Sequence, residues 1–139
     1  MDDAARARIH TSFAAQSMMA TFGATLVTVE AEHVVITAPI LPGSLQQQGF
    51  GHAGLTFSIG DSAAGYAALT TLPPENEVVT AEIKINLLAP ARGDLLRATG
   101  RVIKPGRRLV VVSAEIHALS DGAETLIAVL QGTMVPVVA

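Results

Sequence analysis

The sequence contains no cysteine and no tryptophan, and it has few aromatic or charged residues. Aromatic residues make up 4% of the chain, with one Tyr and four Phe, and charged residues make up 15%. The absence of cysteine excludes disulfides, thiolate catalysis and Cys-ligated zinc, and it fits a reducing compartment. With so few aromatic side chains, the core has to be built from Ala, Val, Leu and Ile, whose small side chains allow helices and strands to approach closely.

Positive charge is also scarce. The nine Lys and Arg residues are outnumbered by twelve Asp and Glu, which gives a net charge of −3. A nucleic-acid-binding protein draws its affinity largely from a basic surface, so we expect no nucleic-acid partner. Asp2 and Asp3 occupy the position where a secretory signal needs basic residues, which favours a cytoplasmic location. Residues 51–72 are weakly charged but are interrupted by Ser, Thr, Gly and Asp61, so we expect no membrane span.

What the sequence does have is apolar residues. They make up 50% of the 139 residues, a length that suits a single domain over residues 1–139. Such a chain folds rather than remaining disordered. The chain has few charged side chains with which to cover its surface, which suggests that another subunit covers part of its apolar surface.

The pattern of residues predicts an α+β fold. Asp2 and Asp3 precede an Ala-rich helix that Gly23 ends. Residues 53–71 predict one central helix that is apolar on nearly every face and therefore buried on nearly every face. The β-branched, alternating segments predict a hairpin over residues 24–40 and four long strands joined as an antiparallel meander. The four strands are expected at residues 77–88, 94–104, 109–119 and 125–138.

Asp61 is the single residue of the Asp, Glu, Lys and Arg set between Glu32 and Glu75. It falls in the middle of the predicted central helix, where burying an ionised carboxylate is costly unless it is paired or hydrogen-bonded. One interpretation is a structural aspartate bonded to Ser58, Ser62 or the backbone. The other is a catalytic carboxylate.

The start of the central helix supports the catalytic interpretation. The free N–H groups and positive dipole end at residues 51–54 could bind a polarised carbonyl oxygen, and small residues there let a substrate reach the backbone. Asp61 lies eight residues beyond Ala53, which is about 12 Å along a helix axis at 1.5 Å per residue. That is too far for both groups to act on one carbonyl. If they do act together, a second copy of the helix must run antiparallel beside the first in a twofold dimer.

These residues and their spacing resemble the phenylacetate-degradation branch of the hotdog-fold acyl-CoA thioesterases. The resemblance extends over nearly the whole chain and includes the order of the hairpin, the central helix and the four long strands. The residues that carry it are Gln46, His52, Ala53, Gly54, Asp61, Ser62, Ala63, Gly65, Val79, Thr80, Glu82 and the run from Pro90 to Asp94.

The resemblance implies a long antiparallel sheet wrapped around the central helix, and dimers joined edge to edge, with a tetramer as a further option. It implies hydrolysis of an acyl-CoA to a carboxylic acid and free CoA without a metal or cofactor. The N–H of Ala53 would polarise the thioester carbonyl, and Asp61 of the other subunit would act as nucleophile or as general base for water.

Further roles follow from the same resemblance. Thr80 would help hold the attacking water, and His52 would orient the loop or contact the sulfur side of the substrate. Gln46 stands where the family commonly has Asn, and Ala53 stands where it has Gly, which places a methyl group beside the path of the acyl group. Gly54 and Leu55 are expected to contact the substrate.

Four basic residues fall in predicted turns, and each taken singly reads as an ordinary solvated charge. As a group in an acidic protein, they could contact the phosphates of coenzyme A. They are Arg92, Lys104, Arg107 and Arg108.

Other functions have weaker support. The histidines and carboxylates are not spaced as metal ligands, and no serine has a plausible triad. The alternative from another class is a non-catalytic acyl-CoA or acyl-carrier binding module of the same fold, which would not need Asp61. A hotdog dehydratase would need a His and acid pair that we do not find. The sequence leaves the acyl group open between an aliphatic chain and an aromatic ring.

Overall fold

The computed structural model describes residues 1–138. The chain begins with two helices, α1 (Asp3–Ala14) and α2 (Ser17–Thr21), where the sequence predicts one. The side chain of Asp2 caps α1 by accepting a hydrogen bond from the N–H of Ala5 at 2.7 Å. The single-helix prediction is wrong because Gln16 is extended, which turns its side chain toward Tyr66 of the central helix.

The remaining elements match the predicted order. Strands β1 and β2 form the expected hairpin, with the turn residue Glu32 at a positive φ of 62°. A short 3-10 helix (Pro42–Ser44) precedes the central helix α3 (Ala53–Leu69). The strands are β1 (Thr25–Glu30), β2 (His33–Ala38), β3 (Asn76–Leu87), β4 (Leu95–Lys104), β5 (Val110–Ser120) and β6 (Ala123–Val138).

The six strands form one antiparallel sheet in the order β1-β2-β4-β5-β6-β3. The predicted meander therefore holds for β4, β5 and β6 but is wrong for β3, which pairs with β6 instead of β4. Both edges of β4 are already occupied, by β2 and by β5. At 16 residues, β6 is long enough to pair with β5 and β3 along most of their lengths. Within residues 1–138, β3 has β6 as its one strand partner, so its other edge is unpaired.

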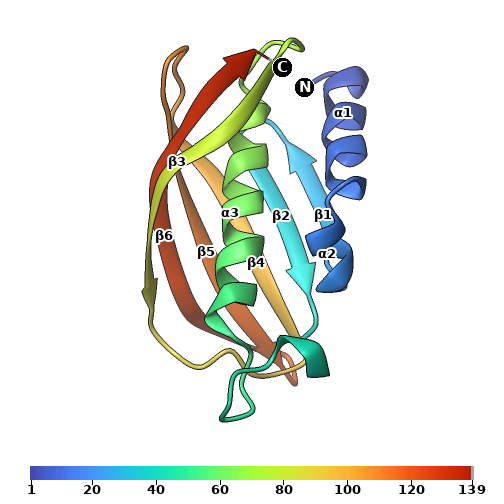
Figure 1. Cartoon of the computed structure of the whole chain (residues 1–139), viewed down its shortest axis with the longest axis vertical. Helices are drawn as coiled ribbons and strands as arrows, with labels where there is room; N and C mark the ends of the chain where they lie inside the picture. Colours follow the sequence, from blue (N-terminus) through green and yellow to red (C-terminus); the bar gives the residue numbers. More distant parts are fainter. Residues whose placement is uncertain (139) are drawn as a thin grey trace.

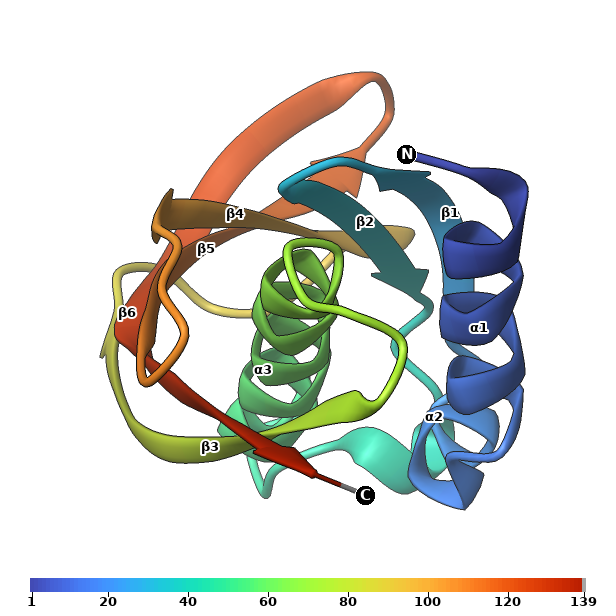
Figure 2. The ribbon, with the colours of Figure 1, turned by 90° about the horizontal axis from the view of Figure 1, so that it is seen from above.

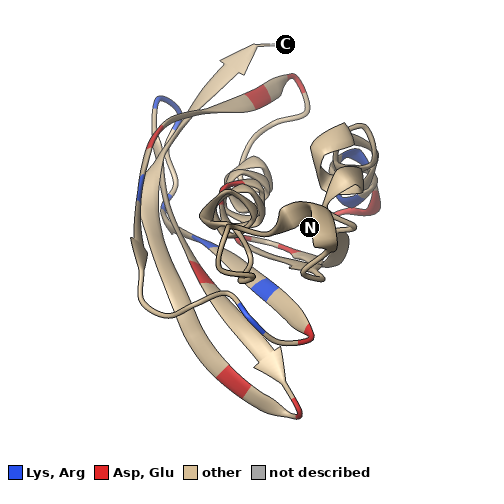
Figure 3. Cartoon of the chain, turned by 60° about the horizontal axis from the view of Figure 1, so that its bottom comes forward, with Lys and Arg blue, Asp and Glu red and all other residues tan. Residues whose placement is uncertain are grey.

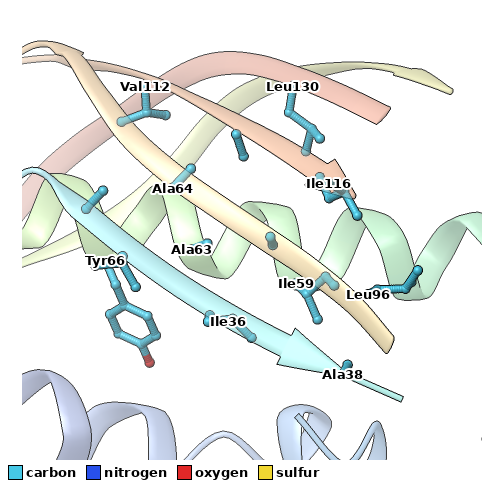
Figure 4. Close-up of a cluster of buried hydrophobic side chains, with 14 of the residues drawn as sticks. Ile36, Ala38, Ile59, Ala63, Ala64, Tyr66, Leu96, Val112, Ile116 and Leu130 are labelled. Atoms are coloured by element: carbon cyan, nitrogen blue, oxygen red, sulfur yellow. The ribbon is translucent and has the colours of Figure 1, made fainter. Parts of the chain in front are cut away.

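The sheet curls around α3, with β1 and β3 at its two ends and α1 and α2 beyond β1 (Figures 1 and 2). Ile59 and Ala63 of α3 pack with Ile36, Leu96 and Ile116 of the sheet in a core of small and medium side chains (Figure 4). Burial of this apolar face is the main force that holds the helix against the sheet.

One face of α3 is open in the single chain, contrary to the prediction that the helix is buried on nearly every face. Ala53 is exposed, Phe57 keeps 36% of its surface exposed, and Asp61 and Gly65 are partly exposed. These four residues are spaced four apart, so they form one stripe along the helix. Ala53 and Phe57 have apolar side chains and Asp61 is charged, so the stripe combines exposed apolar surface with one carboxylate.

Candidate active site

Asp61 lies on the open stripe of α3 and is held by strand β3. The hydroxyl of Thr80 donates a hydrogen bond to Oδ1 of Asp61 at 2.7 Å, and the same hydroxyl lies 3.3 Å from Sδ of Met134. Ser58 and Ser62 are not the partners of Asp61. Ser58 donates to the carbonyl of Gly54 at 2.6 Å, and Ser62 donates to Gln16 Oε1 at 3.4 Å. The carboxylate is therefore oriented on one oxygen and partly open to solvent, unlike a sealed structural aspartate.

The first turn of α3 carries one free backbone donor. His52 is the N-cap, and its Nδ1 accepts a hydrogen bond from the N–H of Gly54 at 2.7 Å, so Nδ1 carries no proton. The N–H of Leu55 donates to the carbonyl of His52 at 3.0 Å. Within residues 1–138, the N–H of Ala53 has no acceptor. His52 therefore leaves Ala53 as the donor available to a carbonyl oxygen.

A groove of about 400 Å³ lies at this end of the helix, and Gln46, His52, Ala53 and Leu87 help to line it. The side chain of Gln46 is engaged within its own loop. Its Oε1 accepts from the N–H of Gln48 and, at 3.3 Å, from the N–H of Phe50. In the single chain Gln46 thus shapes the loop beside Ala53 and helps to line the groove.

The other sequence candidates separate into three places. Leu55 is 1% exposed and packs into the core, so its side chain is not on a substrate-accessible surface. Arg92 follows Ala91, which bridges to Gly51 beside the start of α3. Lys104 ends β4, and Arg107 and Arg108 follow it, so all three lie about 30 Å away at 3.3 Å per residue of the strand. One chain therefore does not bring the four basic residues together.

A second pocket, of about 230 Å³, opens beside Asp61 and Thr80. Its walls include residues that the sequence analysis missed, among them Tyr66 on α3 and Gln16 between α1 and α2. One signal could have pointed to Tyr66. It is the one tyrosine of the chain and follows Asp61 by five residues on the same helix, and a buried phenol needs a hydrogen-bond partner. No sequence signal places Gln16 beside it. The further lining residues are Ser12, Ser62, Gly65, Leu69, Glu77, Val78 and Met134.

Among residues 1–138, no group of three or more His, Asp or Glu side chains could hold a metal ion. In the same part of the chain, no helix has the length and hydropathy needed to cross a bilayer. The acidic and basic side chains lie mainly on strands and loops, and α3 carries one charge, that of Asp61 (Figure 3).

Comparison with known proteins identifies the family. Residues 48–125, which include α3 and strands β3 to β5, match the model of the thioesterase superfamily. The chain belongs to this superfamily and has the hotdog fold, as the resemblance of its motifs implied.

Relatives and solved structures agree with this assignment. A thioesterase family protein from Silicibacter pomeroyi is 38% identical, covers 97% of this chain and 99% of its own, and superposes with a TM-score of 0.94. The PaaI protein of the E. coli phenylacetic acid degradation operon has the same fold, with 22% identity, a TM-score of 0.84, and coverage of 96% and 93%.

The curated relatives either match a shorter part of this chain or share fewer identical residues with it. The 1,4-dihydroxy-2-naphthoyl-CoA hydrolase of Listeria monocytogenes is 27% identical over 82% of this chain and 90% of its own. A Saccharolobus solfataricus protein provisionally named as an esterase is 42% identical over 60% of this chain. That match spans about half of the relative, 53%, and the same share holds for a Pseudomonas aeruginosa relative.

Proposed function

We propose that the protein is an acyl-CoA thioesterase whose two active sites each combine Asp61 of one subunit with the start of α3 of the other. The observation that carries the proposal is that two catalytic groups lie apart on one open face of α3. A carboxylate oriented by Thr80 and a free backbone donor at Ala53 lie on the same stripe. They are separated by about 12 Å, too far to meet on one carbonyl.

A twofold axis brings the two halves together. If two copies of α3 run antiparallel with Asp61 facing Ala53 of the partner subunit, the midpoint between them is residue 57. Phe57 then lies on the axis and packs against its counterpart. The unpaired edge of β3 lies beside the same open face and can continue the sheet into the second subunit. The exposed apolar side chains of Phe57 and Leu87 favour this contact.

The same axis would bring basic residues of the two subunits toward one another. Because the two subunits run in opposite directions, Arg92 of one subunit lies toward the end that carries Arg107 and Arg108 of the other. Phosphates of coenzyme A, which remain near solvent, would meet positive charge there. Residues from both subunits would thus hold the substrate, with the thioester between Ala53 and Asp61.

The reaction joins an oxygen to the thioester carbon and breaks the carbon–sulfur bond. The N–H of Ala53 stabilises the charge that develops on the carbonyl oxygen. Asp61 either removes a proton from the attacking water or attacks the carbonyl itself to form an anhydride that water then opens. In both routes the thiolate takes up a proton and leaves as free CoA, and the acyl group leaves as a carboxylic acid. An anhydride that water opens at the Asp61 carbonyl leaves unlabelled oxygen from Asp61 in the product of a single turnover in ¹⁸O-labelled water, which the general-base route cannot do.

The test is release of free thiol from a panel of acyl-CoAs by the purified protein. Asp61→Asn keeps the shape of the side chain and its contact with Thr80 but removes the charge. It should abolish thiol release while the oligomeric state and the fold stay unchanged. Full activity of this variant would refute the mechanism. Saturable acyl-CoA binding without thiol release by the wild type would instead favour the non-catalytic binding module.

A further inference from the structure

The backbone just before the start of α3 is fixed between two other segments of the chain. Gly51 bridges to Leu45 on one side and to Ala91 on the other, in both cases antiparallel. Its N–H donates to the carbonyl of Ala91 at 2.7 Å. Gly51 is buried, and Ala91 keeps 7% of its surface exposed. Three extended segments therefore meet two positions before Ala53.

The residue between Gly51 and Ala53 is also held by its backbone. The N–H of His52 donates to the carbonyl of Ser44 at 2.8 Å, so it is not available to a ligand. Within residues 1–138, the N–H of Ala53 is the first along this stretch that has no acceptor. Because the N–H groups of residues 51 and 52 are both bound, a displacement at Gly51 is carried along the chain to the donor of Ala53.

The contact between Gly51 and Ala91 leaves no room for a second side chain. A Cβ at Gly51 would lie 3.1 Å from Cβ of Ala91 and 3.3 Å from its carbonyl oxygen. Cγ2 of Ile40 would follow at 3.5 Å. A methyl group added here would push the two segments apart by a few tenths of an ångström, because a packed interior has no free space to receive it.

The segment that carries Ala91 is anchored to the end of β5. The N–H of Asp94 donates to the carbonyl of Leu119 at 2.8 Å. A Cβ at Gly93 would lie 2.7 Å from the same carbonyl oxygen, so the segment and the strand are in close contact. Because the sheet holds Ala91 in place, a methyl group at Gly51 would displace the start of α3.

We propose that Ala91 is a positioning residue for the reaction, because its contact with Gly51 sets where the N–H of Ala53 meets the thioester carbonyl oxygen. This inference rests on the proposed thioesterase activity. A donor stabilises the developing oxyanion only when it points at the place that the oxygen takes in the transition state. A displacement of a few tenths of an ångström should therefore lower kcat by about tenfold and leave KM nearly unchanged.

The first experiment exchanges the two side chains. Gly51→Ala crowds the contact and should lower kcat about tenfold in the thiol-release assay. Ala91→Gly loosens the contact and should lower kcat by a smaller factor, about threefold. The double variant Gly51→Ala/Ala91→Gly again has one methyl group between the segments, so it should recover most of the wild-type kcat. Gly43→Ala is the control, because nothing lies within 4 Å of its Cβ position.

A spectroscopic measurement separates positioning from a general loss of folded protein. The probe is a CoA ketone in which a methylene group replaces the sulfur of the fastest substrate and the carbonyl carbon is ¹³C, so that it binds without being hydrolysed. Polarisation by the N–H of Ala53 should move the ¹³C resonance downfield in the wild-type complex. Gly51→Ala should reduce this shift and the double variant should restore it. Unfolded protein does not bind the probe and contributes nothing to the bound signal.

The outcomes distinguish the two proposals. If no acyl-CoA releases thiol, the thioesterase assignment fails. If the wild type is active but Gly51→Ala keeps its kcat and ¹³C shift, or if the double variant is no better than Gly51→Ala, the positioning inference alone is overturned. Ala91 also lines the groove, so a change in KM without a change in kcat would mean that it contacts the substrate directly and would overturn the inference too. If Gly51→Ala does not fold, Ala91→Gly, which adds no atoms, decides by the same two measurements.

Discussion

Thr80 connects the edge strand β3 to the carboxylate of Asp61. Its hydroxyl donates to Asp61 at 2.7 Å, and a hydrogen bond to a charged group contributes about 1.5–3 kcal/mol. Thr80→Val keeps the shape of the side chain but removes the donor, so kcat should fall at least about tenfold. Thr80→Ser should retain most of the activity. Equal rates for the Val and Ser variants in the thiol-release assay would mean that the hydroxyl does not orient Asp61.

At the scale of elements, the closest contact between α3 and the sheet depends on a missing side chain. A Cβ at Gly100 of β4 would lie 2.3 Å from the backbone of Ala63, so the helix and the strand touch there. Gly100→Ala should therefore lower the free energy of unfolding by about 3 kcal/mol, the upper end of the cost of overpacking. Gly43→Ala is the control, because nothing lies within 4 Å of its Cβ position. Urea denaturation measures both, and similar midpoints for the two variants would contradict the close packing.

An ion pair links strands β4 and β6 across the outer face of the sheet. Arg97 and Glu124 lie 2.7 Å apart, and the hydrogen bond from Arg97 lowers the pKa of Glu124 below its ordinary value of 4.5. The same contact raises the pKa of Arg97. Because the lowered pKa belongs to the folded state, the pair stabilises the fold above the unfolded pKa of the carboxyl group, and this contribution is lost as the pH falls through the folded value.

The expected result is a pH-dependent difference between the wild type and Glu124→Gln. At low salt the wild type should have the higher urea midpoint at pH 7, and the difference should disappear toward pH 3. Glu115→Gln on β5 serves as the control, since Glu115 is exposed and forms no ion pair within residues 1–138. A difference for Glu124→Gln that is the same at both pH values would exclude the pairing as its cause.

At the scale of the whole molecule, the absence of cysteine gives a direct test of the proposed dimer. Phe57→Cys would introduce the one thiol of each chain at the position placed on the twofold axis. Mild oxidation, or a short bis-maleimide, should then link two subunits covalently. Val27→Cys, at a site that is 56% exposed on β1, is the control and should remain unlinked.

A charged residue at the same position tests whether the dimer is needed for activity. Phe57→Glu places two negative charges face to face on the axis, so light scattering should show monomers and thiol release should be lost with dimerisation. A monomeric variant with full activity would disprove the shared site. Failure of Phe57→Cys to link, with the wild type dimeric, would show that the helices pair in another way.

The sequence by itself determined an α+β fold around one central helix, the boundaries of most elements to within a few residues, and the isolation of Asp61. These features rest on local periodicity, on Gly and Pro between strands, and on charges that a one-dimensional pattern displays. The tertiary structure decided what depends on contacts between distant residues. It placed β3 beside β6 and left the other edge of β3 unpaired within residues 1–138. It also made Thr80, rather than a neighbouring serine, the hydrogen-bond partner of Asp61. It also broke the first helix so that Gln16 reaches Tyr66, 50 residues away, a hydrogen bond that no local pattern encodes.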